Sequence, residues 1–299
     1  MRIGLKDIDT HNFPNLALMK ISGYHKSKGD DVEWVNAFFH YDIIYMSKIF
    51  TFTPDDYTSY QCDDIRKGGT GYDIRTKLPH MIEDVENPDY TIYPQYEYSI
   101  QRYSIGCIRH CPFCLVHEKE GAIKPQRPMK LNPKGKWIEV IDNNFFANPN
   151  WRESIEHLHS CSQPVNLHGV DVRIMDEEQA FYLNRLKHKG NIHIAWDLPQ
   201  LDLTDRLKDM IKFIKPYKIT CYVLIGYNST MEQDLHRLQV LKELGILPFV
   251  QPYRDFNNSR IPTQYEKDLA RWANRAWLFK SMDFEDYEPR KGFKCINYF

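Results

Sequence analysis

Apolar runs and helical patterns alternate through the first part of the chain. Strands are predicted at 2–8, 31–36 and 41–47, a helix at 15–30, and a glycine-rich turn at 65–73. This strand–helix–strand order is typical of a parallel sheet covered by helices. We therefore expect residues 1–95 to form a small, doubly wound (Rossmann-like) α/β domain. The segment 82–97, rich in acids, prolines and tyrosines, is expected to form a linker or surface strap.

The rest of the chain repeats a strand–helix unit. Strands are predicted at 99–105, 137–141, 165–168, 192–196, 219–225 and 247–250, and helices at 149–160, 176–189, 203–214, 229–244 and 262–282. Six such units favour a partial (β/α)6 barrel of the TIM type over residues 96–260, because an eight-fold barrel needs about 250 residues. Residues 261–299 then add a C-terminal helix and tail. In such barrels, chemistry lies at the carboxyl ends of the strands.

Composition narrows the class of protein. The 299 residues are 42% hydrophobic and 26% charged, as in globular proteins, and the net charge of -1 does not indicate nucleic-acid binding. Aromatic and basic residues are interleaved in 271–280, but Trp272, Ala276 and Phe279 follow helical spacing and favour a buried helix face. The first residues do not resemble a signal peptide, and no apolar run reaches about 18 residues. We expect a cytoplasmic protein without membrane contact.

Cysteine usage points to metal chemistry. Seven cysteines, an odd number, favour reduced thiols over a disulfide framework. The stretch 106–114, GCIRHCPFC, places Cys107, Cys111 and Cys114 directly after the strand at 99–105, and so at the expected mouth of the barrel. A zinc site would need a fourth ligand, for which His110 and His117 are available. Three thiolates alone suit an iron–sulfur cube with one open iron. Both alternatives remain open on the residues alone.

The spacing C-x3-C-x2-C, with the aromatic Phe113 before the last cysteine, resembles the radical S-adenosylmethionine (SAM) superfamily. In that family the motif follows the first strand of a partial (β/α)6 barrel. The resemblance implies a [4Fe–4S] cluster on the three cysteines and reductive cleavage of SAM to a 5′-deoxyadenosyl radical. It also implies a reductase or a flavodoxin- or ferredoxin-type electron donor. The substrate and the reaction outcome are not specified by the sequence.

The resemblance further assigns SAM contacts after the later strands. Asn143 and Asn144 stand where the family carries a glycine-rich stretch facing the SAM amino group, although they also suit an Asx turn. Arg173 is placed to pair with a carboxylate, with a surface salt bridge as the alternative. Asp197 is placed to bind the ribose hydroxyls or, alternatively, to cap a loop. Gly226 would let the backbone approach the adenine, or would simply form a turn.

The first domain resembles the cobalamin-binding domains found in some members of this superfamily. The residues that follow the base-off cobalamin pattern are Asp9, His11, Ser47, Gly68 and Gly69. Asp9 would orient His11 as a lower axial ligand. Pro14 and Ile49 depart from the pattern, and the spacing before Gly68 is short. We therefore expect no tight cobalamin binding, and a domain that packs over the barrel mouth as a lid.

A rival hypothesis comes from a different class of protein. The three cysteines would also serve a non-catalytic zinc- or iron–sulfur-binding interaction module. A barrel is more than such a module needs, which favours the enzyme. The other cysteines are expected to be structural, with Cys221 inside an apolar strand.

Overall fold

The computed structural model describes residues 1–257 and 259–299. The strands are β1 (Arg2–Asp7), β2 (Asp31–Trp34), β3 (His40–Ser47), β4 (Gln61–Gly68), β5 (Ser99–Gln101), β6 (Ser104–Ile105), β7 (Lys124–Pro125), β8 (Ile138–Val140), β9 (Val165–Leu167), β10 (Ile192–Ala195), β11 (Ile219–Ile225) and β12 (Leu247–Pro252). The α-helices are α1 (Leu16–Ser27), α2 (His80–Glu83), α3 (Val116–Lys119), α4 (Trp151–Ser160), α5 (Glu177–Arg185), α6 (Thr204–Phe213), α7 (Met231–Glu243), α8 (Gln264–Ala273) and α9 (Ala276–Ser281). Short 3-10 turns lie at Tyr90–Ile92, Phe145–Ala147, Pro216–Lys218 and Cys295–Tyr298.

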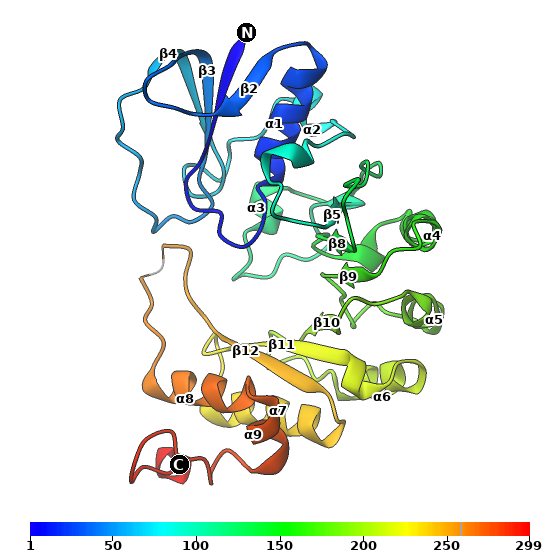
Figure 1. Cartoon of the computed structure of the whole chain (residues 1–299). Coiled ribbons are helices and arrows are strands. Elements are labelled where there is room, and N and C mark those ends of the chain that lie inside the picture. Colours follow the sequence, from blue (N-terminus) through cyan, green and yellow to red (C-terminus); the bar gives the residue numbers. More distant parts are fainter. Residues whose placement is uncertain (258) are drawn as a thin grey trace.

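The N-terminal part contains a parallel sheet of four strands in the order β2-β1-β3-β4. Helix α1 lies beside this sheet and packs Leu18 and Met19 into one core with Ile3 and Leu5 (Figure 1). Loops, not helices, join β2 to β3 and β3 to β4. Strand β4 includes residues 65–68, so the prediction of a turn beginning at 65 was wrong there. The pairing of β4 with the buried strand β3 outweighs the local glycine signal.

Six further parallel strands follow, arranged as two sheets in the orders β5-β8-β9 and β10-β11-β12. A bridge between Val170 and Ile194 connects the two sheets. Figure 1 shows these strands in succession down the molecule, with α4, α5 and α6 on their outer side. The α/β class with parallel sheets is therefore confirmed. No closed barrel is formed within residues 1–257 and 259–299.

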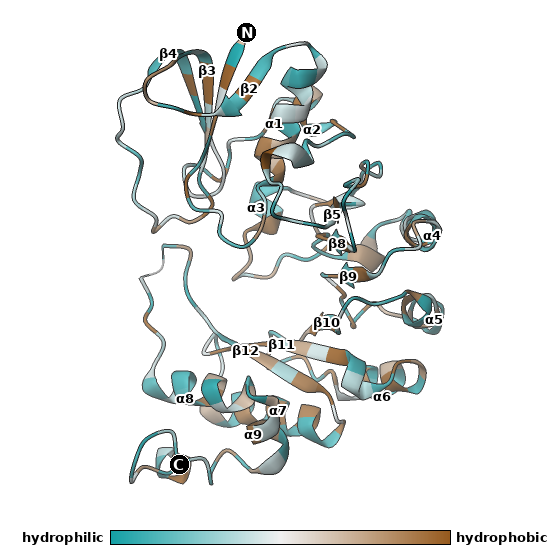
Figure 2. Ribbon diagram, in the orientation of Figure 1, coloured by the Kyte–Doolittle hydropathy of each residue, from teal (hydrophilic) through white to brown (hydrophobic). Residues whose placement is uncertain are grey.

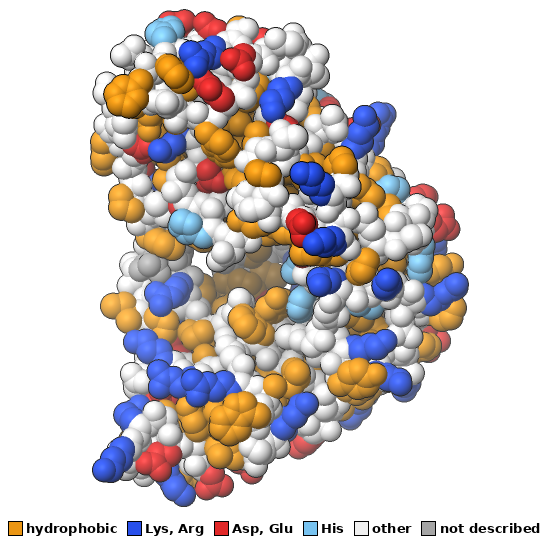
Figure 3. All heavy atoms as spheres, in the orientation of Figure 1, with side chains coloured by type: hydrophobic (Ala, Val, Ile, Leu, Met, Phe, Trp, Pro, Cys, Tyr) orange, Lys and Arg blue, Asp and Glu red, His pale blue; other side chains and the backbone are white. Residues whose placement is uncertain are grey.

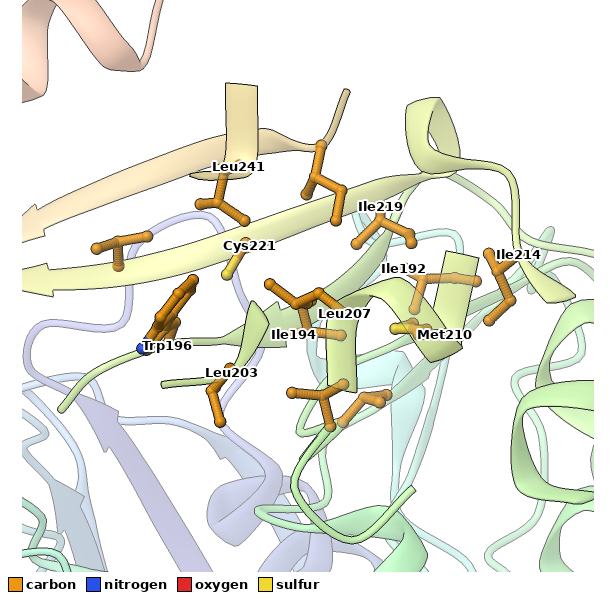
Figure 4. Close-up of a cluster of buried hydrophobic side chains, with 14 of the residues drawn as sticks. Ile192, Ile194, Trp196, Leu203, Leu207, Met210, Ile214, Ile219, Cys221 and Leu241 are labelled. Carbon is orange, nitrogen blue, oxygen red and sulfur yellow. The ribbon is translucent and has the colours of Figure 1, made fainter. Parts of the chain in front are cut away.

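The main core lies between these strands and their helices. In β11, alternate residues Ile219, Cys221 and Val223 are fully buried, as expected for a strand covered on one face. Figure 4 shows Ile192 and Ile194 of β10 with Leu207 and Met210 of α6 in the same cluster. Figure 2 shows the complementary pattern, with hydrophilic residues on the outer faces of the helices.

The helix boundaries follow from capping. Thr230 caps α7 by accepting from the Gln233 N–H, and the Gln233 side chain accepts in return from the Thr230 N–H. The single helix predicted at 262–282 is instead two helices, α8 and α9. Between them, Asn274 exchanges hydrogen bonds with the backbone of Val250 in β12 (2.6 and 3.0 Å). This contact turns the chain back onto the sheet and ends the first helix.

One loop from the upper part of the molecule and one from the lower part approach each other at the side opposite the outer helices (Figure 1). The Thr51 hydroxyl, in the loop between β3 and β4, donates to the Phe256 carbonyl, after β12, at 2.7 Å. Figure 3 shows a hollow between these parts, with hydrophobic side chains inside it and histidines beside it. Within the described residues, no helix is long and apolar enough to cross a membrane.

Candidate functional site

The cysteine loop spans residues 106–123 and is closed at its base by the antiparallel pair β6 and β7. Gly106 has a φ of +78°, and a β-carbon there would lie 2.4 Å from the Ala122 carbonyl oxygen, so only glycine fits. The Gly106 N–H donates to Glu120 at 2.8 Å, and Asn143 donates to the same carboxylate at 2.7 Å. Asn143 therefore holds the cysteine loop through its side chain, a role that neither the SAM contact nor the Asx turn expected for it describes.

The three thiols of this loop are reduced and partly exposed. Burial raises the pKa of the Cys114 thiol, and the charges of Cys111, Cys107 and Asp197 add to the rise, while the Val116 N–H opposes it. The three cysteines and Asp197 thus lie close enough to influence one another electrostatically. The Cys107 sulfur accepts hydrogen bonds from the Arg109 N–H (3.4 Å) and from Asn144 Nδ2 (3.9 Å).

Asp171 anchors the cysteine loop to the segment after β9. Its carboxylate accepts from Arg109 Nε (3.0 Å), from Arg173 Nε and Nη2 (2.6 and 3.0 Å), and from Asn144 Nδ2 (3.2 Å). Burial alone would raise the pKa of Asp171, but the two guanidinium groups hold it below the usual value. Arg173 also interacts with Cys111. The structure therefore shows Arg173 in a salt bridge within the chain, beside the cysteines.

Two further carboxyl groups lie at strand ends near this anchor. Asp197 follows β10, and burial raises its pKa, while Arg173, Arg237 and the Leu224 N–H oppose the rise. Asp142 follows β8 and is almost fully buried, which raises its pKa to about 6. It accepts from the Tyr103 N–H (2.9 Å) and the Ser104 hydroxyl (2.5 Å). Asp142 thereby fixes the chain that leads into the cysteine loop.

The aromatic Phe113 is part of a ring cluster at the carboxyl ends of β11 and β12. Its ring meets Tyr227 edge-on at 5.3 Å between centroids, and Tyr227 meets Tyr253 at 4.7 Å. Gly226, next to Tyr227, has a φ of +72°. A β-carbon there would lie 2.1 Å from Glu266 Oε1, which is paired with Arg260. The atoms that lie closest to Gly226 therefore belong to the Glu266–Arg260 ion pair.

The donor set of the loop fits the cluster that the cysteine spacing implies. All three thiols belong to one loop. Beside Cys107, the buried Oδ1 atom of Asn144 has no hydrogen-bond partner within the described residues. A buried acceptor without a partner is costly, and an ammonium group would satisfy it. Within the described residues, no three or more His, Cys, Asp or Glu side chains are already gathered as a metal site. His110 and His117 lie with ring centroids 5.1 Å apart, so the zinc alternative also has candidate ligands nearby.

The residues of the cobalamin-like pattern take other roles. Both oxygens of Asp9 accept from backbone N–H groups, of Ile49 (2.7 Å) and Phe50 (2.9 Å), so Asp9 does not hold His11. The Ser47 hydroxyl accepts from Asn15. The turn at Gly68–Gly69 wraps the backbone of Lys48. His11 is exposed at the edge of a cavity of about 490 Å³ at the carboxyl end of β1.

Sequence reasoning missed several residues that shape the site. Arg109 and Glu120 hold the cysteine loop through contacts that are distant in sequence. Arg237 in α7 reaches the carbonyls of Trp196 (2.7 Å) and Leu224 (2.9 Å) and thereby fixes the ends of β10 and β11. No local pattern distinguishes these charged residues from ordinary surface charges.

Comparisons with known proteins do not assign the chain to a family. No family model matches the chain. The chain is 27% identical to sorting nexin-7 of Homo sapiens over 127 residues, covering 40% of this chain and 33% of that protein. It thus spans about a third of the length of this curated relative. A partial match at this identity does not show a shared family, and the resemblance to radical SAM enzymes finds no support in it.

Proposed function

We propose that the chain is a radical SAM enzyme, with residues 96–260 as a partial (β/α)6 barrel, residues 1–95 as a small domain over its mouth, and residues 261–299 as a C-terminal extension. The observation that carries the proposal is the placement of Cys107, Cys111 and Cys114. They lie on one loop that follows the parallel strand β5 through the short antiparallel pair β6 and β7, beside the unpartnered acceptor of Asn144.

In the proposed enzyme, each side chain near the cysteine loop has a role. Cys107, Cys111 and Cys114 would hold a [4Fe–4S] cluster, which would supply the electron for reductive cleavage of SAM. Asn144 Oδ1 would accept from the SAM ammonium, and the buried Asp197 would accept from the ribose hydroxyls. Phe113 and Tyr227 cover the adenine and exclude water. Arg173, already bound to Asp171, keeps positive charge next to Cys111.

The small domain closes the site without a cofactor of its own. The bond from Thr51 to Phe256 joins its loop to the loop after β12 and supports the role of a lid. The engagement of Asp9 by two backbone N–H groups supports the absence of tight cobalamin binding. We place the protein in the cytoplasm, with a reductase or a flavodoxin- or ferredoxin-type electron donor as partner.

A second candidate is a non-catalytic zinc- or iron–sulfur-binding interaction module. The zinc form is favoured by one observation, the position of His117 beside His110, because the buried His117 Nδ1 atom has no hydrogen-bond partner. A fourth ligand from either histidine would complete a tetrahedral site with three thiolates.

Metal analysis of the full chain, purified without oxygen and reconstituted with iron and sulfide, separates the enzyme from the zinc form of the module. The enzyme predicts about four irons and four sulfides per chain with broad visible absorption. Cys111→Ala should lose them, whereas Cys161→Ala, which removes a partly exposed thiol outside the loop, should keep them. Stoichiometric zinc without iron in the purified protein would overturn the proposal and favour the module.

A further inference from the structure

A second group of polar side chains lies on the face of the parallel strands opposite the helix-covered core. Glu139 in β8, Asn166 in β9, His193 in β10 and Tyr222 in β11 each alternate with fully buried apolar residues, such as Ile192 and Ile194 beside His193. Because side chains alternate between the two faces of a strand, these residues share the inner face. The inner face of the sheets is therefore polar.

Ring contacts join this row across neighbouring strands. His168, directly after β9, stacks on His193 with centroids 5.2 Å apart and planes 12° apart. His193 meets Tyr222 at 5.4 Å, and Tyr222 meets Phe249 of β12 edge-on at 5.3 Å. The Phe249 side chain is 43% exposed and the His168 side chain 35% exposed, so the row is accessible from solvent. The row is a continuous series of ring contacts across neighbouring strands.

Glu139 supplies the negative charge of the row. Its Oε1 atom accepts from Trp137 Nε1 (2.7 Å), and its Oε2 atom accepts from Asn166 Nδ2 (2.8 Å) and His168 Nε2 (3.0 Å). Although burial raises the pKa of Glu139, these donors hold it below its ordinary value. The carboxylate is thus ionised at neutral pH, and it fixes the orientation of both Asn166 and His168.

Within the described residues, two buried polar atoms of the row have no hydrogen-bond partner. A carboxylate only accepts, so His168 Nε2 carries the shared hydrogen. Asn166 directs its Nδ2 group to Glu139, and its buried Oδ1 has no partner. The buried Nδ1 of His193 also lacks a partner, and burial lowers the pKa of this ring, which keeps it neutral. Leaving buried polar atoms unpaired is unfavourable unless a ligand satisfies them.

From this geometry we propose that Glu139, Asn166, His168 and His193 form a binding site for a flat, neutral or cationic group that donates N–H bonds, such as an amide, amidine or guanidine. The unpartnered acceptor Asn166 Oδ1 and the Glu139 carboxylate require donors, and the stacked rings of His168 and His193 suit a planar group. The Glu139 carboxylate, whose hydrogen-bond partners within the described residues are Trp137, Asn166 and His168, repels anions.

The site adjoins the cysteine loop through one short segment. His168 and Asp171 are three residues apart, and Asp171 anchors Arg109 of that loop. The binding site stands on the inner-face contacts alone. That its ligand is the substrate of the reaction rests on the proposed function.

Isosteric small molecules test the site directly. Acetamidinium and acetate have the same shape but opposite charge, and acetamide is their neutral counterpart. The full chain, free of iron, sulfide and SAM, is titrated with each while the imidazole ¹⁵N resonances are followed by NMR. His168→Phe and His193→Phe assign the two signals. We expect acetamidinium and acetamide to shift both signals saturably in the millimolar range, and acetate to leave them unchanged.

Equal or stronger shifts by acetate, or none by acetamidinium, would overturn the proposal. Glu139→Gln should weaken acetamidinium at least about tenfold, whereas Glu178→Gln, which alters an exposed ion pair, should not. If Glu139→Gln fails to fold, the comparison of the three probes on the unaltered chain still decides. Because the protein carries no cluster in this experiment, failure here and failure of the radical SAM proposal are separate results.

Discussion

Arg109 and Asp171 connect the cysteine loop to the segment that follows β9, with Arg109 Nε donating to Asp171 Oδ2 at 3.0 Å. The two residues are 62 positions apart in the chain. The same carboxylate binds Arg173 and Asn144, so one buried acceptor organises three side chains around the thiols.

Replacing Asp171 should loosen the cysteine loop. Asp171→Ala leaves Arg109, Arg173 and Asn144 without their shared partner, and we expect a loss of about 3 kcal/mol in the free energy of unfolding. In the metal-free protein, Cys107 and Cys111 should be alkylated by iodoacetamide several-fold faster, as measured by mass spectrometry. Asp176→Ala is the control, because Asp176 caps α5 and does not contact the loop. Unchanged alkylation in Asp171→Ala would show that the loop is held by other contacts.

Arg237 should be a principal stabiliser of the strand ends. It is almost fully buried, pairs with Asp234 at 2.6 Å and donates to the carbonyls of Trp196 and Leu224. Removing one partner of a buried pair leaves the other charge uncompensated, so Arg237→Met should cost about 3–5 kcal/mol in urea unfolding. Arg152→Met, which breaks an exposed pair with Glu178, should change the unfolding midpoint little. Comparable midpoints for the two variants would refute this role.

Asp142 should make stability depend on pH. Burial raises its pKa from 3.8 to about 6, so the fold prefers the protonated carboxyl. The stability that this group contributes is present below about pH 4 and is lost as the pH rises through about 6. Asp142→Asn keeps an uncharged acceptor for the Tyr103 N–H. Relative to the unaltered protein, the variant should gain about 3 kcal/mol between pH 4 and pH 7. A pH-independent difference between the two proteins would contradict the assignment.

Hydroxocobalamin should not bind tightly to the first domain. Both carboxylate oxygens of Asp9 accept from the backbone N–H groups of Ile49 and Phe50, so Asp9 is not placed to orient His11. A spectroscopic titration of the full chain should show no complex at micromolar concentrations, and His11→Ala should behave like the unaltered protein. A micromolar or tighter complex that His11→Ala weakens would reverse this conclusion and make methyl transfer the leading reaction.

Local patterns in the sequence were sufficient for most elements of the fold. Capping by Thr230 and the alternation in 219–225 specify α7 and β11 directly, because both signals act within a few residues. The local signals predicted wrong boundaries where a contact with a residue distant in sequence determines where an element begins or ends. Asn274 interrupts the last predicted helix through the backbone of Val250, and pairing with β3 extends β4 into the glycine turn.

In the candidate site, too, some features follow from local sequence and others from contacts between distant residues. The cysteine spacing is a local signal, whereas the anchoring of Arg109 by Asp171 depends on folding. The inner-face row left a trace in the sequence, because Glu139, Asn166 and His193 each stand between two apolar residues of a short strand. That alternation indicates a strand with one polar face. The alternation does not show which residues of neighbouring strands contact one another, because those contacts depend on the order of the strands in the sheet.

Cleavage of SAM by the reconstituted protein tests the central claim most directly. The full chain, reconstituted with iron and sulfide without oxygen, is mixed with SAM and a strong reductant, and 5′-deoxyadenosine is quantified. We predict that it forms, and that Cys107→Ala, Cys111→Ala and Cys114→Ala each abolish it. Cys221→Ala should retain it while losing on the order of 1–2 kcal/mol of stability, because it removes a fully buried strand side chain. Formation of 5′-deoxyadenosine at the native rate by Cys111→Ala, or none by the unaltered protein carrying its cluster, would contradict the account.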